Sequence, residues 1–168
     1  MKNYKIIVQY DGSEYSGWQI QPNTRTIQEE IGNAIKTLVK GEVNLIGSGR
    51  TDTGVHAIGQ AANFRCESTL ELGKFIYSLN SILPKSIAIK SAEEVPEEFH
   101  ARFDARKREY VYLISKKKSP FYYKYSYFYN KELDISGLNN LNPELTGKKD
   151  FRSFAKSLLL SIILLPRA

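Results

Sequence analysis

The N-terminal part of the chain alternates between short strand patterns and two amphipathic helix patterns. Residues 4–10 ("YKIIVQY") are rich in β-branched and aromatic side chains and end at an Asp-Gly turn signal, which predicts a strand. Residues 26–40 predict a helix, because their apolar positions recur at helical spacing. Thr26 and Glu29 have the spacing of a capping box at the start of this helix, and Gly41 is expected to end it.

The rest of the pattern predicts four more strands and a second helix. In chain order they are a strand at 42–48, a strand at 56–65, a helix at 70–80, a strand at 86–95 and a strand at 107–115. Gly59 marks a candidate bulge in the second of these elements. The last of them, "KREYVYLIS", carries the clearest strand pattern in the chain. This order predicts an α+β fold, with helices packed on one side of a largely antiparallel sheet.

Composition and charge narrow the class of protein. The chain has 168 residues and 19.2 kDa, about the length of one domain. A net charge of +6 and a pI near 9.3 favour an anionic partner, most commonly nucleic acid. Cys66 is the only cysteine, so no internal disulfide can form. The N-terminus lacks a signal-peptide pattern, and the apolar run Leu158–Leu165 is far shorter than the roughly 20 residues that span a bilayer. We therefore expect a cytoplasmic protein.

Residues 47–64 ("GSGRTDTGVHAIGQAANF") hold the densest candidate chemistry. Asp-Thr-Gly is also the tripeptide that carries the catalytic aspartate of pepsin-like proteases. Those enzymes need two carboxylates that share one proton, whereas this chain has one such tripeptide and would have to dimerise. Arg50 precedes Asp52 by two positions and favours the ionised carboxylate, which argues against a protease. A lone ionised Asp52 remains, either catalytic or paired with Arg50 in an ordinary turn.

The sequence carries no pattern for a metal or a nucleotide phosphate. Its two histidines, His56 and His100, and its single cysteine lack metal-ligand spacing. The glycine-rich stretch lacks the Gly-Lys-Ser/Thr of a P-loop. We therefore expect no cofactor and no metal. For both histidines, a structural hydrogen-bonding role is an alternative to a chemical one.

Four ordered motifs together resemble the tRNA pseudouridine synthase A (TruA) family. They are "YDGSEYSGWQIQPNTRTIQEEI", "GSGRTDTGVHAIGQAANF", "FHARFDARKREYVYLI" and "LTGKKDFRSFAK", spread over about 4–156. The resemblance implies the first ferredoxin-like (RRM-like) half of the pseudouridine synthase fold, a mostly antiparallel sheet with helices on one face. It also implies three segments: an N-terminal ferredoxin-like domain with the catalytic loop at 1–105, the start of a second α+β domain at 106–156, and a divergent apolar tail at 157–168.

The resemblance also implies roles for individual residues. Asp52 becomes the catalytic carboxylate. Arg50, beside it, and Tyr110, stacked on the target uracil, become substrate-binding residues, and such stacking contributes about 1–3 kcal/mol. Three arginines that precede Tyr110 are candidate contacts to the RNA backbone: Arg102, Arg106 and Arg108. Tyr112 shares the face of Tyr110 in the predicted strand, and for it we expect core packing.

The implied reaction is isomerisation of uridine to pseudouridine at nucleotides 38, 39 and 40 of the tRNA anticodon stem-loop, without a cofactor. A uridine in a paired stem has to be flipped out first. The implied partner is tRNA, which intact relatives grip as homodimers, and for this chain a homodimer is expected if the fold is complete. The family pattern continues beyond the length of this chain, so we expect truncation near Ser157, through a frameshift or an early stop, with impaired activity. The alternative from another class is a non-catalytic RNA-binding or inert fragment.

Overall fold

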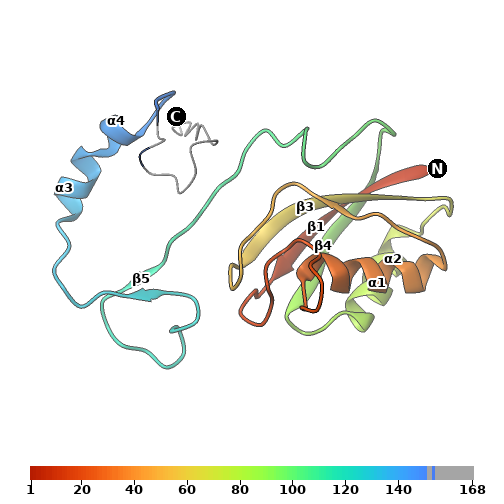
Figure 1. The fold of residues 1–168 in the computed structure, drawn as a ribbon, viewed down its shortest axis with the longest axis horizontal. Coiled ribbons are helices and arrows are strands. Elements are labelled where there is room, and N and C mark those ends of the chain that lie inside the picture. Colours follow the sequence, from red (N-terminus) through yellow and green to blue (C-terminus); the bar gives the residue numbers. More distant parts are fainter. Residues whose placement is uncertain (151–152, 154–168) are drawn as a thin grey trace. The chain divides into compact units, whose positions relative to one another are not determined.

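β1 (Lys2–Tyr10) lies inside a four-stranded antiparallel sheet of strand order β2-β3-β1-β4 in the computed structural model. The other elements of this layer and its two helices are α1 (Ile27–Val39), β2 (Ile46–Gly47), β3 (Ala57–Cys66), α2 (Leu72–Ile82) and β4 (Ile87–Val95). Both helices lie on one face of the sheet (Figure 1). The chain order β-α-β-β-α-β is that of the ferredoxin-like fold. The predicted fold class, α+β with a ferredoxin-like half, is confirmed.

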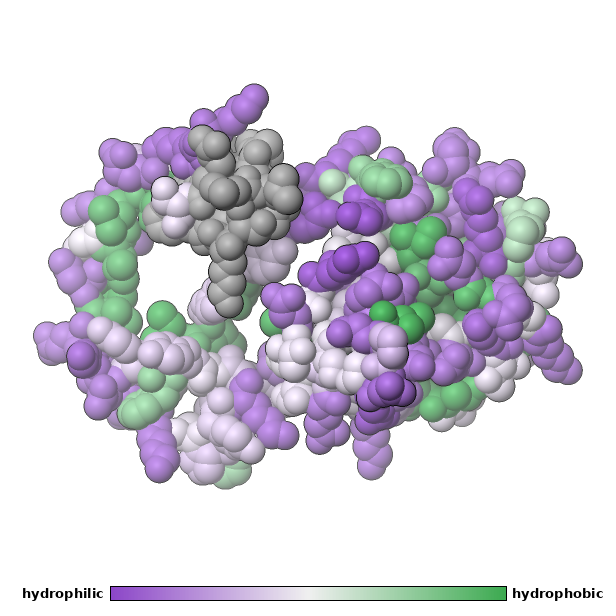
Figure 2. All heavy atoms as spheres, in the orientation of Figure 1, coloured by the Kyte–Doolittle hydropathy of each residue, from purple (hydrophilic) through white to green (hydrophobic). Residues whose placement is uncertain are grey.

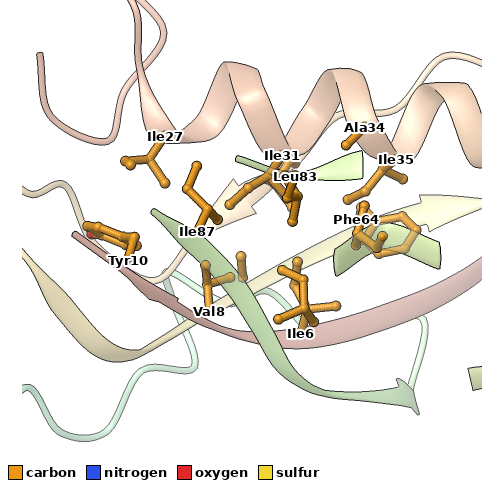
Figure 3. Close-up of a cluster of buried hydrophobic side chains, with 14 of the residues drawn as sticks. Ile6, Val8, Tyr10, Ile27, Ile31, Ala34, Ile35, Phe64, Leu83 and Ile87 are labelled. Carbon is orange, nitrogen blue, oxygen red and sulfur yellow. The ribbon is translucent and has the colours of Figure 1, made fainter. Parts of the chain in front are cut away.

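The hydrophobic core fills the space between α1 and the sheet. Ile6, Val8 and Tyr10 point to the helix side, because alternate side chains of a strand share a face. Ile31 and Ile35 of α1 pack toward them (Figure 3), and all five side chains are buried. A fully buried isoleucine contributes roughly 1.5–3 kcal/mol. This layer therefore fixes β1, the strand that leads into the candidate site.

The ends of α1 differ from the capping pattern in the sequence. Thr26 is the N-cap residue, but its side chain makes no capping hydrogen bond. Its Oγ1 is buried and has no hydrogen-bond partner among the described residues. The predicted capping box with Glu29 is therefore wrong, because the buried Thr26 hydroxyl accepts no helix N–H group. The helix ends at Val39, and Lys40 rather than Gly41 takes the left-handed backbone conformation, with φ 52°.

The bulge predicted at Gly59 is confirmed. The register of β3 against β1 shifts between the Val8–Gln60 and Tyr10–Ala57 pairs. Two residues of β3, one of them Gly59, therefore oppose a single residue of β1. Bulges of this kind redirect side chains and are frequent beside active sites. This one adjoins the glycine-rich loop that precedes β3.

The strand predicted over 107–115 is wrong for most of its length. Only β5 (Ile114–Ser115) is a strand, and it pairs in parallel with β6 (Tyr127–Phe128). Tyr112 is 89% exposed, so the core packing expected for it is also wrong. A strand needs a neighbouring strand to satisfy its backbone N–H and C=O groups. Among the described residues, only β6 offers one, and alternation of side chains does not report whether a partner strand exists.

The structure describes residues 1–150 and 153. The chain divides into two compact units, Met1–Val111 and the residues from Tyr112 onward. The second unit contains β5, β6, α3 (Ile135–Asn140) and α4 (Asn142–Leu145), and hydrophobic residues reach its surface (Figure 2). The tail predicted at 157–168 lies outside the described residues, and the three-segment division stays a prediction. Within the described part of the chain, no helix is long and apolar enough to cross a membrane.

Candidate active site

The motif around Asp52 forms the loop between β2 and β3, residues 48–56, which we call the Asp52 loop. It begins with a hydrogen bond from the Ser48 amide to the Ala61 carbonyl, 2.8 Å long, which extends the β2–β3 pairing. At the loop tip, the Val55 amide donates to the Asp52 carbonyl at 3.1 Å. Gly54 within this turn has φ +77°, a conformation that favours glycine. The loop is therefore an ordered turn at the end of the sheet.

The first motif of the chain forms a layer that holds the Asp52 loop. The Trp18 amide donates to the Thr51 carbonyl at 3.0 Å, and the Gly54 amide donates to the Tyr15 carbonyl at 3.3 Å. At Gly17, where φ is +87°, an added Cβ would lie only 2.4 Å from the Thr51 oxygen. The segment "YDGSEYSGWQ" thus needs its glycines because two backbones touch there.

Trp18 itself supports the backbone at Gly47, directly before the loop. Its ring is 1% exposed, and a Cβ on Gly47 would lie 2.5 Å from the indole. The backbone at Gly47 therefore lies flat against the ring. The sequence pattern alone does not mark these residues as supports of the loop. The available signal was the combination of the only tryptophan with glycines in both motifs, which marks close approach of backbone and ring.

Two polar side chains of the sheet, Tyr10 of β1 and Gln60 of β3, hold the loop. The Tyr10 hydroxyl lies 2.8 Å from Thr51 Oγ1 and 2.8 Å from Gln60 Oε1. Gln60 Nε2 donates to the Gly49 carbonyl at 2.9 Å. Burial raises the pKa of the Tyr10 hydroxyl to about 12, against a smaller lowering by the hydrogen bond with Thr51. Residues on the N-terminal side of Asp52 are thus fixed through both main chain and side chains.

Asp52 and Arg50 are exposed at the surface of this anchored loop. Arg50 Nε donates to Gln19 Oε1 at 3.1 Å. Within the described residues no ion pair joins Arg50 to Asp52, so the pairing expected from the sequence does not form in this structure. The two side chains of an Arg-x-Asp segment share a face only in an extended strand, and this segment lies in a loop. Both side chains are open to a ligand.

The segment that carries Tyr110 contacts the Asp52 loop through Arg108. Arg108 Nη2 donates to the Ser48 carbonyl at 2.7 Å, so one candidate phosphate contact binds the loop itself. Tyr110 is 71% exposed. It follows Arg108 by two residues, which places its Cα within about 7 Å of the Arg108 Cα. Arg102 and Arg106 are exposed, and no described contact brings either to the loop.

The two histidines make structural contacts. His56 Nδ1 lies 3.1 Å from the Gly12 amide and 3.1 Å from Asp11 Oδ1. With a proton on Nδ1 the ring donates to Asp11, and without it the ring accepts from Gly12. Either way, His56 ties the end of the loop to the turn after β1. His100 accepts the Arg102 amide at its Nδ1, 3.2 Å away, and stabilises a turn remote in sequence from the loop.

Metal-binding geometry is missing from the described residues: no three His, Cys, Asp or Glu side chains come together as ligands would. The chemistry available at the loop is that of the exposed Asp52 carboxylate, with Arg50 two residues before it and Arg108 bound to the loop at Ser48. The ferredoxin-like sheet therefore presents one exposed carboxylate on an anchored, glycine-rich loop.

Comparison with known proteins identifies the family. The family model for tRNA pseudouridine synthase matches residues 6–104, and the chain belongs to this family. It is 47% identical over 159 residues to tRNA pseudouridine synthase A of Caldicellulosiruptor bescii. It is 44% identical over 161 residues to the protein of the same name from Brachyspira hyodysenteriae. Each match covers 94% of this chain and 65% of the relative, so the chain spans just under two thirds of the length of these relatives.

Proposed function

We propose that the chain converts uridine to pseudouridine in tRNA, with Asp52 as the catalytic carboxylate. The observation that carries the proposal is the contrast between Asp52 and its neighbours. Its side chain is exposed, whereas Gly49 and Thr51 are held by Gln60, Tyr10 and the main chain of the preceding motif. A fixed backbone with a free carboxylate is what preorganised catalysis requires.

The reaction needs no external reactant, because substrate and product are isomers. The N1–C1′ bond of uridine breaks and a C5–C1′ bond forms, while the proton on C5 leaves and N1 gains one. A carboxylate can act in this sequence as a nucleophile on the nucleoside or as a general base for the C5 proton. Asp52 is the candidate for either step, since both need an ionised oxygen next to the extruded nucleoside.

The flanking side chains support the same substrate. A uridine paired in a stem has to leave the helix before Asp52 can reach it. Tyr110 offers an exposed ring for stacking, and Arg50 offers a guanidinium that can occupy the vacated space or bind a phosphate. Arg102, Arg106 and the N–H groups of Arg108 that do not contact Ser48 are assigned to the phosphate backbone.

We propose nucleotides 38, 39 and 40 of the anticodon stem-loop as the target, a homodimer as the assembly and the cytoplasm as the location, all on the basis of family resemblance. The net charge of +6 supports the tRNA partner. The segments at 1–105 and 106–156 are proposed as the catalytic domain and the start of a second one.

The test is incubation of the purified chain with unmodified tRNA, followed by nucleoside chromatography and mapping of the modified position. We expect pseudouridine from the wild type and none from Asp52→Asn. Asp134→Asn is the matched control, because Asp134 caps α3 in the other unit and asparagine caps equally well. Binding of tRNA without product from the wild type would support the non-catalytic fragment instead.

A further inference from the structure

A directed chain of hydrogen bonds runs behind the Asp52 loop. Gln60 Nε2 donates to the Gly49 carbonyl, so the Gln60 oxygen must face Tyr10, where it can only accept. The Tyr10 hydroxyl has a single proton and gives it to Gln60. Thr51 Oγ1 must therefore donate to the Tyr10 oxygen. The direction of every bond from Thr51 through Tyr10 and Gln60 to Gly49 is thereby fixed.

This chain of hydrogen bonds closes a short arc of backbone that ends directly before Asp52. Its two ends, Thr51 and Gly49, flank Arg50, and Thr51 directly precedes Asp52. The Thr51 carbonyl is held independently by the Trp18 amide at 3.0 Å. A residue fixed through its side chain on one side and its carbonyl on the other has little freedom to rotate. The direction of the next Cα–Cβ bond, that of Asp52, is therefore restricted by the contacts of Thr51.

The central member of the chain lies in the core. Tyr10 is 3% exposed and belongs to β1. Its ring lies against Trp18, with 6.1 Å between ring centroids. Loss of its hydroxyl would leave the part-buried Gln60 oxygen without this donor and Thr51 Oγ1 without this acceptor. Leaving such groups unpaired costs free energy in proportion to their burial.

We propose that Tyr10, Thr51 and Gln60 are positioning residues for Asp52, acting through the loop backbone without contact with the RNA. The inference rests on the proposed function of Asp52. It differs from a general stabilising role, because it predicts an effect on turnover larger than the effect on tRNA binding. A carboxylate displaced by about an ångström costs on the order of a hundredfold in rate, while the RNA-binding surface stays in place.

Tyr10→Phe and Tyr4→Phe form the matched pair for the test. Tyr4 is another buried tyrosine of β1, and its hydroxyl also makes two hydrogen bonds, to Ser68 and Leu70, far along the strand from the loop. We expect kcat for pseudouridine formation to fall about tenfold to a hundredfold in Tyr10→Phe, with KM for tRNA changed less than about threefold. Tyr4→Phe should keep kcat within about threefold of the wild type, even if its melting temperature falls as far as that of Tyr10→Phe.

Thr51 provides the rescue by a conservative variant. Thr51→Val keeps the shape of the side chain but removes the hydroxyl, and should reproduce the loss in kcat. Thr51→Ser keeps the donor to Tyr10 and should retain most of the turnover. Equal kcat for Thr51→Val and Thr51→Ser, or a Tyr10→Phe loss confined to KM, would overturn the proposal.

A second readout separates this inference from the proposed function. Hydrogen exchange of peptides that cover residues 48–56 is measured on the same variants without any RNA. Faster exchange there in Tyr10→Phe than in Tyr4→Phe supports the positioning role, and equal exchange overturns it. If the wild type yields no pseudouridine, the proposed function fails, while the exchange comparison still decides whether Tyr10 fixes the Asp52 loop.

Discussion

Gly17 is one of the points at which the two motifs of the site touch, and its replacement gives a quantitative test of their packing. A Cβ at Gly17 would lie 2.4 Å from the Thr51 carbonyl oxygen, well inside contact distance. That oxygen cannot retreat freely, because it accepts the Trp18 amide at 3.0 Å and belongs to a residue tied to Tyr10. Gly17 also has φ +87°, which disfavours any other residue.

Gly54 is the matched control for this experiment. It has a similar φ of +77°, but an added Cβ would meet nothing within 4 Å. Gly54→Ala therefore carries only the conformational cost, about 1–2 kcal/mol for a left-handed alanine. Gly17→Ala carries that cost plus overpacking of about 1–3 kcal/mol. The difference between the two variants isolates the contact between the motifs.

Urea unfolding followed by fluorescence of Trp18, the only tryptophan, measures this difference in the unit that contains both glycines. With an m-value of about 2 kcal/mol per molar urea, Gly17→Ala should unfold roughly 0.5–1.5 M earlier than Gly54→Ala. Equal midpoints for the two variants would show that the first motif does not press against the loop, and the described packing would be refuted.

Three further predictions follow from other parts of the structure. Thr26→Val should leave the urea midpoint unchanged or raise the free energy of unfolding by up to about 1 kcal/mol, because the hydroxyl it removes is buried without a partner. Because the pKa of Tyr10 is raised to about 12, its contribution to stability is complete below the unfolded pKa near 10 and is lost as the pH rises toward 12. Thermal melts between pH 8 and 11.5 should therefore show about 2 kcal/mol less alkaline destabilisation in Tyr10→Phe than in the wild type. Arg106→Ala should weaken tRNA binding and lower the salt dependence of binding by about one ion. Arg108→Ala should also lower kcat, because it removes the hydrogen bond to Ser48. Identical kinetics for the two variants would contradict this distinction.

The ferredoxin-like half was predictable because its elements bury an apolar face within their own length. The apolar stripe of α1 and the alternation in β1 directly identify side chains that face the core. Gly59 indicated a bulge, because a glycine inside a strand pattern often marks an irregularity. The segment 107–115 was not predictable in the same way. Its alternation is as regular, but strand formation depends on a neighbour that side-chain pattern does not encode.

The sequence predicted which residues belong to the candidate site but not how they contact one another. The motifs pointed to the loop and to Asp52, but the expected ion pair with Arg50 is absent among the described contacts, where Gln19 takes its place. Tyr10 and Trp18 support the Asp52 loop, but the hydrophobic pattern of the sequence marks them only as core residues. Their role depends on which loop they meet in three dimensions, and spacing along the chain does not contain that information.

The central claim is that the Asp52 carboxylate acts on a uridine of tRNA, and release of tritium from tRNA carrying uridine labelled at C5 tests it most directly, since the C5 proton must leave as the C5–C1′ bond forms. We predict that the wild type and Asp134→Asn release tritium in single turnover, and that Asp52→Asn is slower by about a hundredfold to ten-thousandfold. Release by Asp52→Asn at the wild-type rate would contradict the account.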